Sequence, residues 1–213
     1  MDLDEAYSVK TPQDSRKLYA TWAATYNKTF IKANDYVYPL TIAQKFDEKI
    51  PQTEVNAVVD IGCGTGAVGS YLANLRPNLR IDGIDISPEM LAEAAKLKRI
   101  KNSPVYNDLV EVDLTAELPN RSYDAMISAG TFTHGHLGPE TLLSLINLLR
   151  IGGWFVIGIN AQHFLSQNFG LSLQEVQDSG AISNVDSHNV QIYGPTSPHY
   201  GDCAKVCIFR RLL

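Results

Sequence analysis

Cysteine is scarce in this chain of 213 residues, which contains only Cys63, Cys203 and Cys207. A structural zinc site needs four ligands at characteristic spacings, and these residues do not provide them. Cys63 has no histidine or lysine beside it in the sequence, so it is better interpreted as a small buried residue than as a nucleophile. The sequence therefore predicts no metal site and no disulfide framework.

Concentrated positive charge is also missing. The chain carries 18 Lys and Arg residues against 23 Asp and Glu residues, which gives a formal net charge of −5. A short basic run at residues 96–101 falls at the end of a predicted helix, where cations favour the helix dipole. Proteins that hold nucleic acids need a basic surface for the phosphates. The composition therefore argues against a nucleic-acid partner.

Apolar runs are too short to cross a membrane. The longest apolar region, 142–159, is interrupted by Arg150 and the Gly152-Gly153 pair, and this pattern favours an amphipathic helix followed by a strand. The N-terminal sequence MDLDEAYSVK is acidic and lacks the apolar core of a signal peptide. We therefore expect a cytoplasmic protein without a membrane partner.

The most informative segment that the chain does contain is a glycine-rich turn between a predicted strand and a predicted helix. Residues 55–69 read VNAVVDIGCGTGAVG, and their β-branched run is typical of a strand buried in a parallel sheet. Gly62, Gly64 and Gly66 let the backbone turn sharply and let a ligand approach closely. The following helix begins with free N–H groups. This arrangement predicts a binding site for a nucleoside cofactor.

Two classes of cofactor use such a turn. Gly64, Gly66 and Gly69 also match the GxGxxG pattern of dinucleotide-binding proteins. In those proteins the helix N-terminus receives a pyrophosphate, which an acid at the strand end would repel. Asp60 occupies that position, and its carboxylate suits a ligand with positive charge. The alternative is that Asp60 is an ordinary strand-end acid that caps the next helix.

Further acidic residues lie at the ends of later predicted strands. Residues 80–87 (RIDGIDIS) place Asp85 where an acid can bind both hydroxyls of a ribose, and Ser87 is a suitable N-cap for the next helix. Residues 109–114 (LVEVDL) place Asp113 at a similar point. Both acids can instead be ordinary turn residues, which is how most Asp residues at strand ends behave.

Together these motifs resemble those of the class I S-adenosylmethionine-dependent methyltransferases. DIGCGTG is similar to the first motif of that family, and the family pattern DxSxxML stands here at residues 85–91. Residues 123–130 resemble the fourth motif, whose end faces the transferable methyl group, and residues 150–160 resemble the fifth strand. S-adenosylmethionine carries an ammonium and a sulfonium but no phosphate, which agrees with an acid at position 60.

The resemblance implies a Rossmann-like α/β fold, a three-layer sandwich around a seven-stranded, mostly parallel sheet with a C-terminal antiparallel hairpin and an N-terminal helical lid. We expect a single domain over 1–213, divided into a lid (1–54), a cofactor-binding core (55–160) and a substrate-side segment with the terminal strands (161–213). The patterns predict helices over 67–75 and 171–179, and strands over 80–87, 109–114, 123–130, 150–160, 190–193 and 204–212.

The resemblance also implies where the cofactor binds. The ribose is expected at Asp85, the adenine ring beside Met90, and the adenine amino group at Asp113. The complete set of predicted cofactor-binding residues is Tyr19, Trp22, Tyr26, Asp60, Gly62, Cys63, Gly64, Gly66, Asp85, Ile86, Met90, Asp113, Leu114, Ser128 and Ala129.

Three of these residues form an aromatic stripe ahead of the core. Tyr19, Trp22 and Tyr26 recur at i, i+3 and i+7, so they share one face of a predicted helix. Such a stripe usually packs into a core. The segment YATWAATYN, however, is similar to the YDxWAxxYD-like segment that folds over the cofactor in small-molecule methyltransferases, with Ala20 where an acid is common. Both interpretations, core packing and lid, stay open.

Two histidines follow the fourth motif, in the run SAGTFTHGHLG at residues 128–138. Methyl transfer needs a base only where the attacking atom carries a proton. His134 or His136 can supply that base, because an imidazole titrates near neutral pH. The alternative is that both histidines shape the loop by hydrogen bonding. No nearby pair of carboxylates supports a metal site, so we predict two catalytic candidates and no metal.

Four more residues near the same edge of the sheet are candidates for binding the acceptor: Thr131, Thr133, Asn160 and Phe164. The threonine hydroxyls can instead satisfy backbone groups, and a strand-end asparagine is usually a turn residue. The run from Thr131 is similar to the TFTHGHxGP run of methyltransferases related to the Williams–Beuren region methyltransferase-like protein. That group implies no particular substrate.

These observations predict an enzyme that transfers a methyl group from S-adenosylmethionine to oxygen, nitrogen, sulfur or carbon of a small molecule. One alternative is a protein that binds the cofactor without catalysis, as a sensor or partner subunit. A second is a nicotinamide-dependent oxidoreductase, which Asp60 and the motifs after Asp85 disfavour. The expected partner is a small-molecule acceptor, and the sequence does not define the oligomeric state.

Overall fold

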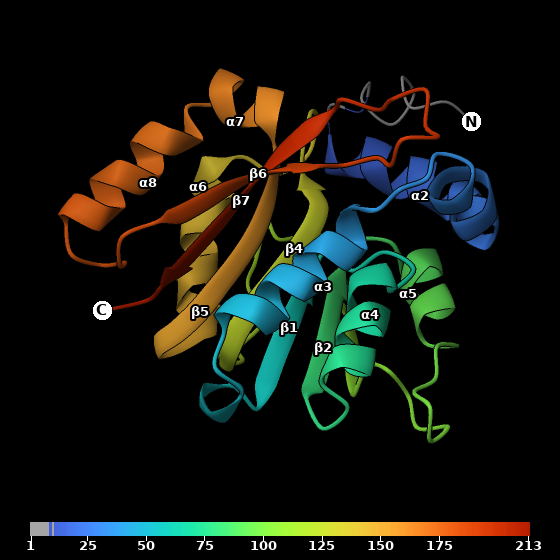
Figure 1. Ribbon diagram of the computed structural model, residues 1–213, viewed down its shortest axis with the longest axis horizontal. Coiled ribbons are helices and arrows are strands. Elements are labelled where there is room, and N and C mark those ends of the chain that lie inside the picture. The colour runs from blue at the N-terminus through green and yellow to red at the C-terminus, as the bar shows by residue number, and fades with distance from the viewer. Residues whose placement is uncertain (1–8, 10) are drawn as a thin grey trace.

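Seven strands form one mixed sheet in the computed structural model of the protein, which describes residue 9 and residues 11–213 (Figure 1). The strands are β1 (Ala57–Ile61), β2 (Arg80–Asp85), β3 (Asp108–Glu111), β4 (Tyr123–Phe132), β5 (Leu149–Asn160), β6 (Asp186–Gln191) and β7 (Cys203–Arg210). Their order is β3-β2-β1-β4-β5-β7-β6. Strands β1 to β5 pair in parallel, whereas β7 pairs antiparallel with both β5 and β6. The predicted fold class is confirmed.

Helices cover both faces of this sheet and complete a three-layer sandwich (Figure 1). The helical segments are α2 (Pro12–Tyr26), a π-helix (Asn27–Lys32), α3 (Tyr38–Lys49), a 3-10 turn (Gln52–Glu54), α4 (Ala67–Leu75), α5 (Pro88–Ala94), α6 (Pro139–Ser144), a 3-10 turn (Leu145–Leu148), α7 (Ala161–Ser166) and α8 (Phe169–Asp178). Side chains of α3, α4 and α5 pack into one core cluster, and side chains of α6 and α8 pack into a second.

Strand β1 connects the two clusters. Val58 packs with Ile42 and Leu72 in the cluster beneath α3 and α4, whereas Val59 packs with Leu142 in the other cluster. Both valines are fully buried, as expected for successive residues of a strand that is covered on both faces. Burial of each contributes about 1.5–3 kcal/mol. The strand that leads into the glycine turn is therefore firmly held.

Several local predictions agree with the structure, and others do not. The helix predicted over 67–75 has those bounds. The strand predicted over 109–114 ends earlier, at Glu111, because the carboxylate of Asp113 accepts hydrogen bonds from the backbone N–H and the hydroxyl of Thr115 (2.9 and 2.6 Å). This side-chain turn competes with continued strand pairing.

Strand β6 lies earlier in the chain than predicted. The prediction placed it over 190–193, but the strand covers Asp186–Gln191, whose sequence DSHNVQ has little β propensity. It is held by antiparallel pairing with β7, in which Ser187 lies opposite Cys207. The position of this strand therefore depends on its neighbour, which local sequence patterns do not reveal.

Helix α2 lies at the carboxyl ends of β2 and β3. The Arg16 guanidinium donates from Nε to the carbonyl of Ile86 (3.1 Å) and forms an ion pair with Glu111. The predicted lid covered 1–54, of which residues 1–8 and 10 lie outside the described residues, and the three-part division stays a prediction. Within the described chain, no helix is both long and apolar enough to cross a membrane.

Candidate functional site

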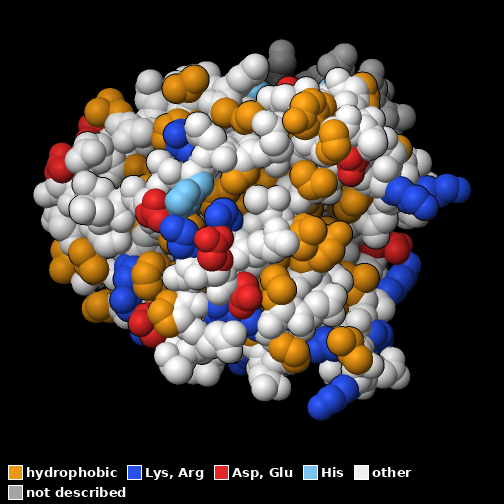
Figure 2. Space-filling model, viewed as in Figure 1, with side chains coloured by type: hydrophobic (Ala, Val, Ile, Leu, Met, Phe, Trp, Pro, Cys, Tyr) orange, Lys and Arg blue, Asp and Glu red, His pale blue; other side chains and the backbone are white. Residues whose placement is uncertain are grey.

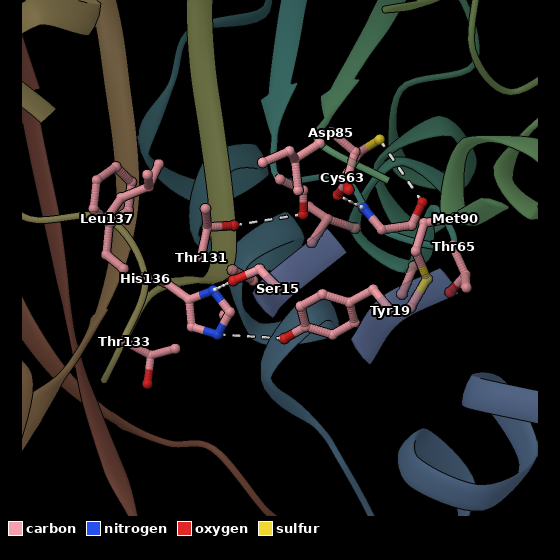
Figure 3. Close-up of a pocket in the computed structure, with 18 of the residues that line it drawn as sticks. Ser15, Tyr19, Cys63, Thr65, Asp85, Met90, Thr131, Thr133, His136 and Leu137 are labelled. Atoms are coloured by element: carbon pink, nitrogen blue, oxygen red, sulfur yellow. Dashed lines mark hydrogen bonds between the residues drawn. The ribbon is translucent and has the colours of Figure 1, made fainter. Parts of the chain in front are cut away.

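A cavity of about 470 Å³ lies at the carboxyl ends of the parallel strands. Its walls come from α2, the glycine turn, the ends of β2 and β4, the turn after β3 and the segment after β6. Open α/β sheets bind their ligands at this edge, and small-molecule sites have volumes of about 300–1,000 Å³. In Figure 3, side chains from these elements point toward one another across the cavity.

The glycine turn has three residues in the left-handed region. Gly62, Gly64 and Gly66 have φ values of 62°, 53° and 90°. A Cβ on Gly62 would lie 2.0 Å from Oγ1 of Thr131, so glycine is required there by packing as well as by conformation. A Cβ on Gly64 would meet no atom within 4 Å, so this cavity-lining residue leaves space for a ligand. Gly66 packs against Tyr106 and lies outside the lining.

Asp85, at the end of β2, ties the glycine turn to the next helix. One carboxylate oxygen accepts from the N–H of Gly64 (2.8 Å), and the other accepts from the N–H of Ser87 (2.9 Å). Ser87 in turn caps α5 through the N–H of Met90 (3.3 Å). Burial raises the pKa of Asp85, and these hydrogen bonds oppose that rise. A carboxylate has further lone pairs, so Asp85 can still accept hydrogen bonds from a ligand in the cavity.

Asp60 lies beneath the turn and does not line the cavity. Its side chain is fully buried and accepts a hydrogen bond from the hydroxyl of Tyr106 (2.7 Å). Burial raises the pKa of Asp60 to about 7, although hydrogen bonds from Tyr106 and the backbone of Gly69 lower it. Asp60 can therefore act on a cofactor only through the turn above it. The contact of Tyr106 with Asp60 could not be predicted from the sequence, because nothing in the pattern shows that Tyr106 reaches β1.

The residues expected around the adenine ring belong to the cavity wall. Ile86, Met90, Asp113 and Leu114 all line it, and Met90 is almost fully buried. Cys63 also lines it, and burial raises the pKa of its thiol. The thiol is therefore held in its neutral form, which does not favour nucleophilic chemistry.

Two neighbouring residues of β4, Ser128 and Ala129, have different roles. Ala129 lines the cavity. Ser128 is fully buried and donates its hydroxyl to the carbonyl of Ile61 (2.8 Å), which joins β4 to β1. Successive residues of a strand point to opposite sides, so these two predicted cofactor residues do not share one surface.

The aromatic stripe of α2 packs in the core and also lines the cavity. Tyr19, Trp22 and Tyr26 all line the cavity. Trp22 is also 3% exposed, packs in the core and donates its indole N–H to the hydroxyl of Thr29 (3.1 Å). The same helical face therefore contributes to the core and to the cavity wall.

The two histidines after β4 lie in different places. His136 lines the cavity, with Nδ1 at 3.5 Å from the hydroxyl of Ser15 and Nε2 at 3.5 Å from the hydroxyl of Tyr19 (Figure 3). Both distances are at the outer limit for hydrogen bonds. His134 lies outside this lining, with its ring centroid 5.7 Å from that of His163. Of the pair, His136 is placed to contact a bound molecule.

Three of the four predicted acceptor-binding residues line the cavity: Thr131, Thr133 and Asn160. The hydroxyl of Thr131 donates to the carbonyl of Ile61 (3.0 Å). The side-chain oxygen of Asn160 accepts two backbone N–H groups at the start of α7 (3.0 and 3.1 Å), which explains that unpredicted helix. Phe164 lies outside the lining and stacks on Phe169 at 6.0 Å.

Contacts that hold α2 over the cavity were not visible in the sequence. Besides Arg16, Asn27 accepts a hydrogen bond from the hydroxyl of Thr65 in the glycine turn (2.6 Å). Isolated polar residues on an exposed helical face give no signal of their partners. Within residues 9 and 11–213, no group of three His, Cys, Asp or Glu side chains is arranged to hold a metal ion.

Comparison with known proteins adds to this geometry. Residues 59–155 match the family model described as a methyltransferase domain. Malonyl-[acyl-carrier protein] O-methyltransferase of Bacillus anthracis is 28% identical over 137 residues, which cover 64% of this chain and 49% of the relative. Trans-aconitate 2-methyltransferase of Streptomyces avermitilis is 35% identical over 82 residues, 38% of this chain and 30% of the relative. The chain thus spans half or less of the length of these curated relatives.

A solved structure resembles nearly the whole chain. It is an S-adenosylmethionine-dependent methyltransferase from Clostridium acetobutylicum, with a TM-score of 0.61 and 18% identity over 92% of this chain and 100% of that chain. At this identity the similarity concerns the fold. The overall fold is therefore shared with that structure.

Proposed function

We propose that this chain, whose fold and matched domain are those of class I S-adenosylmethionine-dependent methyltransferases, binds that cofactor and transfers its methyl group to a small-molecule acceptor. The observation that carries the proposal is the position of Asp85. This acid stands at the carboxyl end of β2, lines the cavity and organises the N–H groups of Gly64 and Ser87 around it. A nucleoside ribose is the ligand group that such an acid recognises.

The cavity suits this cofactor better than a dinucleotide. Gly64 leaves open space beside the turn, and Ile86, Met90 and Leu114 offer apolar surfaces for an adenine ring. No Lys or Arg occurs among the described residues that line the cavity. A pyrophosphate would therefore lack a cationic partner there. On the face shown in Figure 2, Lys and Arg side chains are interspersed with Asp and Glu.

The roles of the remaining residues follow from their positions. When bound, S-adenosylmethionine supplies an electrophilic methyl group on a positively charged sulfur. Helix α2 forms part of the cavity wall, and closing such a site against water favours a displacement at a charged centre. His136 stands across from Tyr19 in the cavity, where its imidazole can accept a proton from an attacking atom.

A more specific proposal concerns one group within the methyltransferases. We infer that the chain is related to the Williams–Beuren region methyltransferase-like proteins, on the basis of the run TFTHGHLGP at residues 131–139. This run forms the end of β4 and the loop that carries His136. The relatives named for malonyl-[acyl-carrier protein] and trans-aconitate support a small-molecule acceptor in general terms.

Calorimetric titration with S-adenosylmethionine, S-adenosylhomocysteine and NAD tests the proposed function. We expect both sulfur compounds to bind and NAD not to bind, whereas binding of NAD alone would overturn the proposal. Release of S-adenosylhomocysteine in the presence of acceptor candidates separates an enzyme from a cofactor-binding sensor.

Substitution of Asp85 tests the observation that carries the proposal. Asp85→Ala should weaken S-adenosylhomocysteine binding by at least about ten-fold, because hydrogen bonds to a charged group contribute about 1.5–3 kcal/mol each. The matched control is Asp178→Ala on α8, an exposed acid outside the cavity. Thermal unfolding of the ligand-free variants separates a folding defect from lost contacts. Unchanged affinity in a folded Asp85→Ala protein would contradict the role of this acid.

A further inference from the structure

Five aromatic side chains form a continuous wall on one side of the cavity. This aromatic wall consists of Trp22, Tyr26, Phe30, Tyr36 and Tyr193, all of which line the cavity. Their ring centroids follow one another at short distances: Trp22–Phe30 at 5.2 Å, Tyr26–Phe30 at 5.0 Å, Phe30–Tyr36 at 5.1 Å and Tyr36–Tyr193 at 5.5 Å. Three of these residues lie outside the aromatic stripe that the sequence predicted.

The wall reaches Gly130 near the carboxyl end of β4. A Cβ built on Gly130 would lie 2.7 Å from the hydroxyl oxygen of Tyr36, so this tyrosine stands directly against the backbone there. Gly130 has a φ of 81° and follows Ala129, which lines the cavity. Tyr36 therefore brings the aromatic wall to Gly130, whereas Trp22 and Tyr26 stay candidates for contact with the cofactor.

The described lining of the cavity has acidic side chains but no Lys or Arg. Among its described lining residues, the carboxylates are Asp85 and Asp113, the histidine is His136, and no Lys or Arg is present. Burial raises the pKa of Tyr26, so its phenol stays neutral. A carboxylate brought into this cavity would lose hydration without gaining a cationic side chain, which is costly. A cation or a nascent cation would instead meet aromatic faces, which attract positive charge.

We propose that the methyl acceptor is an amine on an aromatic or apolar body, which the aromatic wall holds beside Gly130. This inference rests on the proposed function and names its substrate class. It separates this chain from the relatives named for malonyl-[acyl-carrier protein] and trans-aconitate, whose printed acceptors are acids or acid derivatives.

The reaction of an amine fits the electrostatics of the wall. The bound ammonium first gives one N–H proton to a ring nitrogen of His136, which lines the cavity. The lone pair freed on nitrogen forms the new N–C bond, and the S–C bond breaks with its electron pair left on sulfur. Positive charge passes from sulfur to nitrogen during the displacement, and the product leaves as a methylated ammonium. Aromatic faces stabilise the charge throughout, whereas methylation of a carboxylate would cancel it.

The test compares three probes that share one phenyl ring and linker: 2-phenylethylamine, 2-phenylethanol and 3-phenylpropionate. Each is titrated into protein saturated with S-adenosylhomocysteine, after saturation has been verified by calorimetry. We expect the amine to bind at least about ten-fold more tightly than the acid, from the strength of cation–π contacts at desolvated sites. Transfer of labelled methyl from S-adenosylmethionine should likewise favour the amine.

Variants of Tyr36 show whether the wall is responsible. Tyr36→Leu removes the aromatic face and should weaken amine binding about five-fold or more while leaving binding of the alcohol within about two-fold. Tyr36→Phe keeps the ring and should restore amine binding. Tyr71→Leu, at an exposed tyrosine of α4 outside the cavity, is the matched control. A merely structural role of Tyr36 would affect the amine and the alcohol equally.

The experiments distinguish a failure of the proposed function from a failure of the amine proposal. Failure to bind S-adenosylhomocysteine would refute the proposed function itself. With that cofactor product bound, equal or tighter binding of 3-phenylpropionate, or no binding of any probe, would overturn the amine proposal alone. Equal losses of amine and alcohol affinity in Tyr36→Leu would also overturn it.

Discussion

Asp60→Asn is expected to remove a strong pH dependence of stability. The pKa of Asp60 is about 7 in the folded protein, against about 3.9 for an unperturbed aspartate. Between these values the folded state holds a proton that the unfolded state has lost, so the free energy of unfolding falls as pH rises through this window. At about 1.36 kcal/mol per pKa unit, the shift of about 3 units corresponds to roughly 4 kcal/mol. Asn cannot titrate, and it keeps an oxygen that can accept from Tyr106.

The assay is urea unfolding of wild type and Asp60→Asn at pH 4.5 and pH 8. The two proteins should have similar stability at the lower pH, and the variant should be more stable at the higher pH by up to roughly 4 kcal/mol. Burial also raises the pKa of Asp85, but Asp85 is present in both proteins and cancels in the difference. Asp178→Asn, an exposed acid, serves as control. Equal pH dependence in wild type and Asp60→Asn would refute the reasoning.

Two further substitutions test the lid and the core. Arg16→Ala removes the contacts with Ile86 and Glu111. Because exposed ion pairs contribute at most about 1 kcal/mol, S-adenosylhomocysteine affinity should fall about two- to five-fold, and the fall should be smaller at high salt. Unchanged affinity in calorimetry would mean that α2 does not retain the ligand. The buried hydroxyl of Tyr38 has no hydrogen-bond partner among the described residues. Tyr38→Phe should therefore stabilise the protein by about 1 kcal/mol in urea unfolding, and destabilisation would reveal a partner for that hydroxyl.

The sequence predicted the elements that depend on local pattern. The helix over 67–75 follows directly from a glycine turn and an apolar helical repeat, and its bounds are confirmed. The order of strands and the antiparallel β7 agree with the fold that the motifs implied. The polar strand β6 was misplaced, because its pairing with β7 supplies the order that its own residues do not.

The site was harder to predict for a related reason. Glycine and aspartate spacings located the turn that lines the cavity, but Asp60 points beneath it toward Tyr106 instead of into the cavity. Tyr36 and Tyr193 come from distant segments that meet at 5.5 Å only in the folded chain. Contacts of this kind depend on tertiary packing, which a linear spacing does not encode. The roles of the candidate site residues stay predictions until a ligand is bound.

A crystal structure with S-adenosylhomocysteine would show directly whether the cavity is a cofactor site. We expect the ribose hydroxyls to lie within hydrogen-bond distance of the Asp85 carboxylate, with the adenine ring against Met90 and the sulfur toward Ala129 and Gly130. A nucleoside bound elsewhere, or a ribose without contact to Asp85, would contradict this expectation.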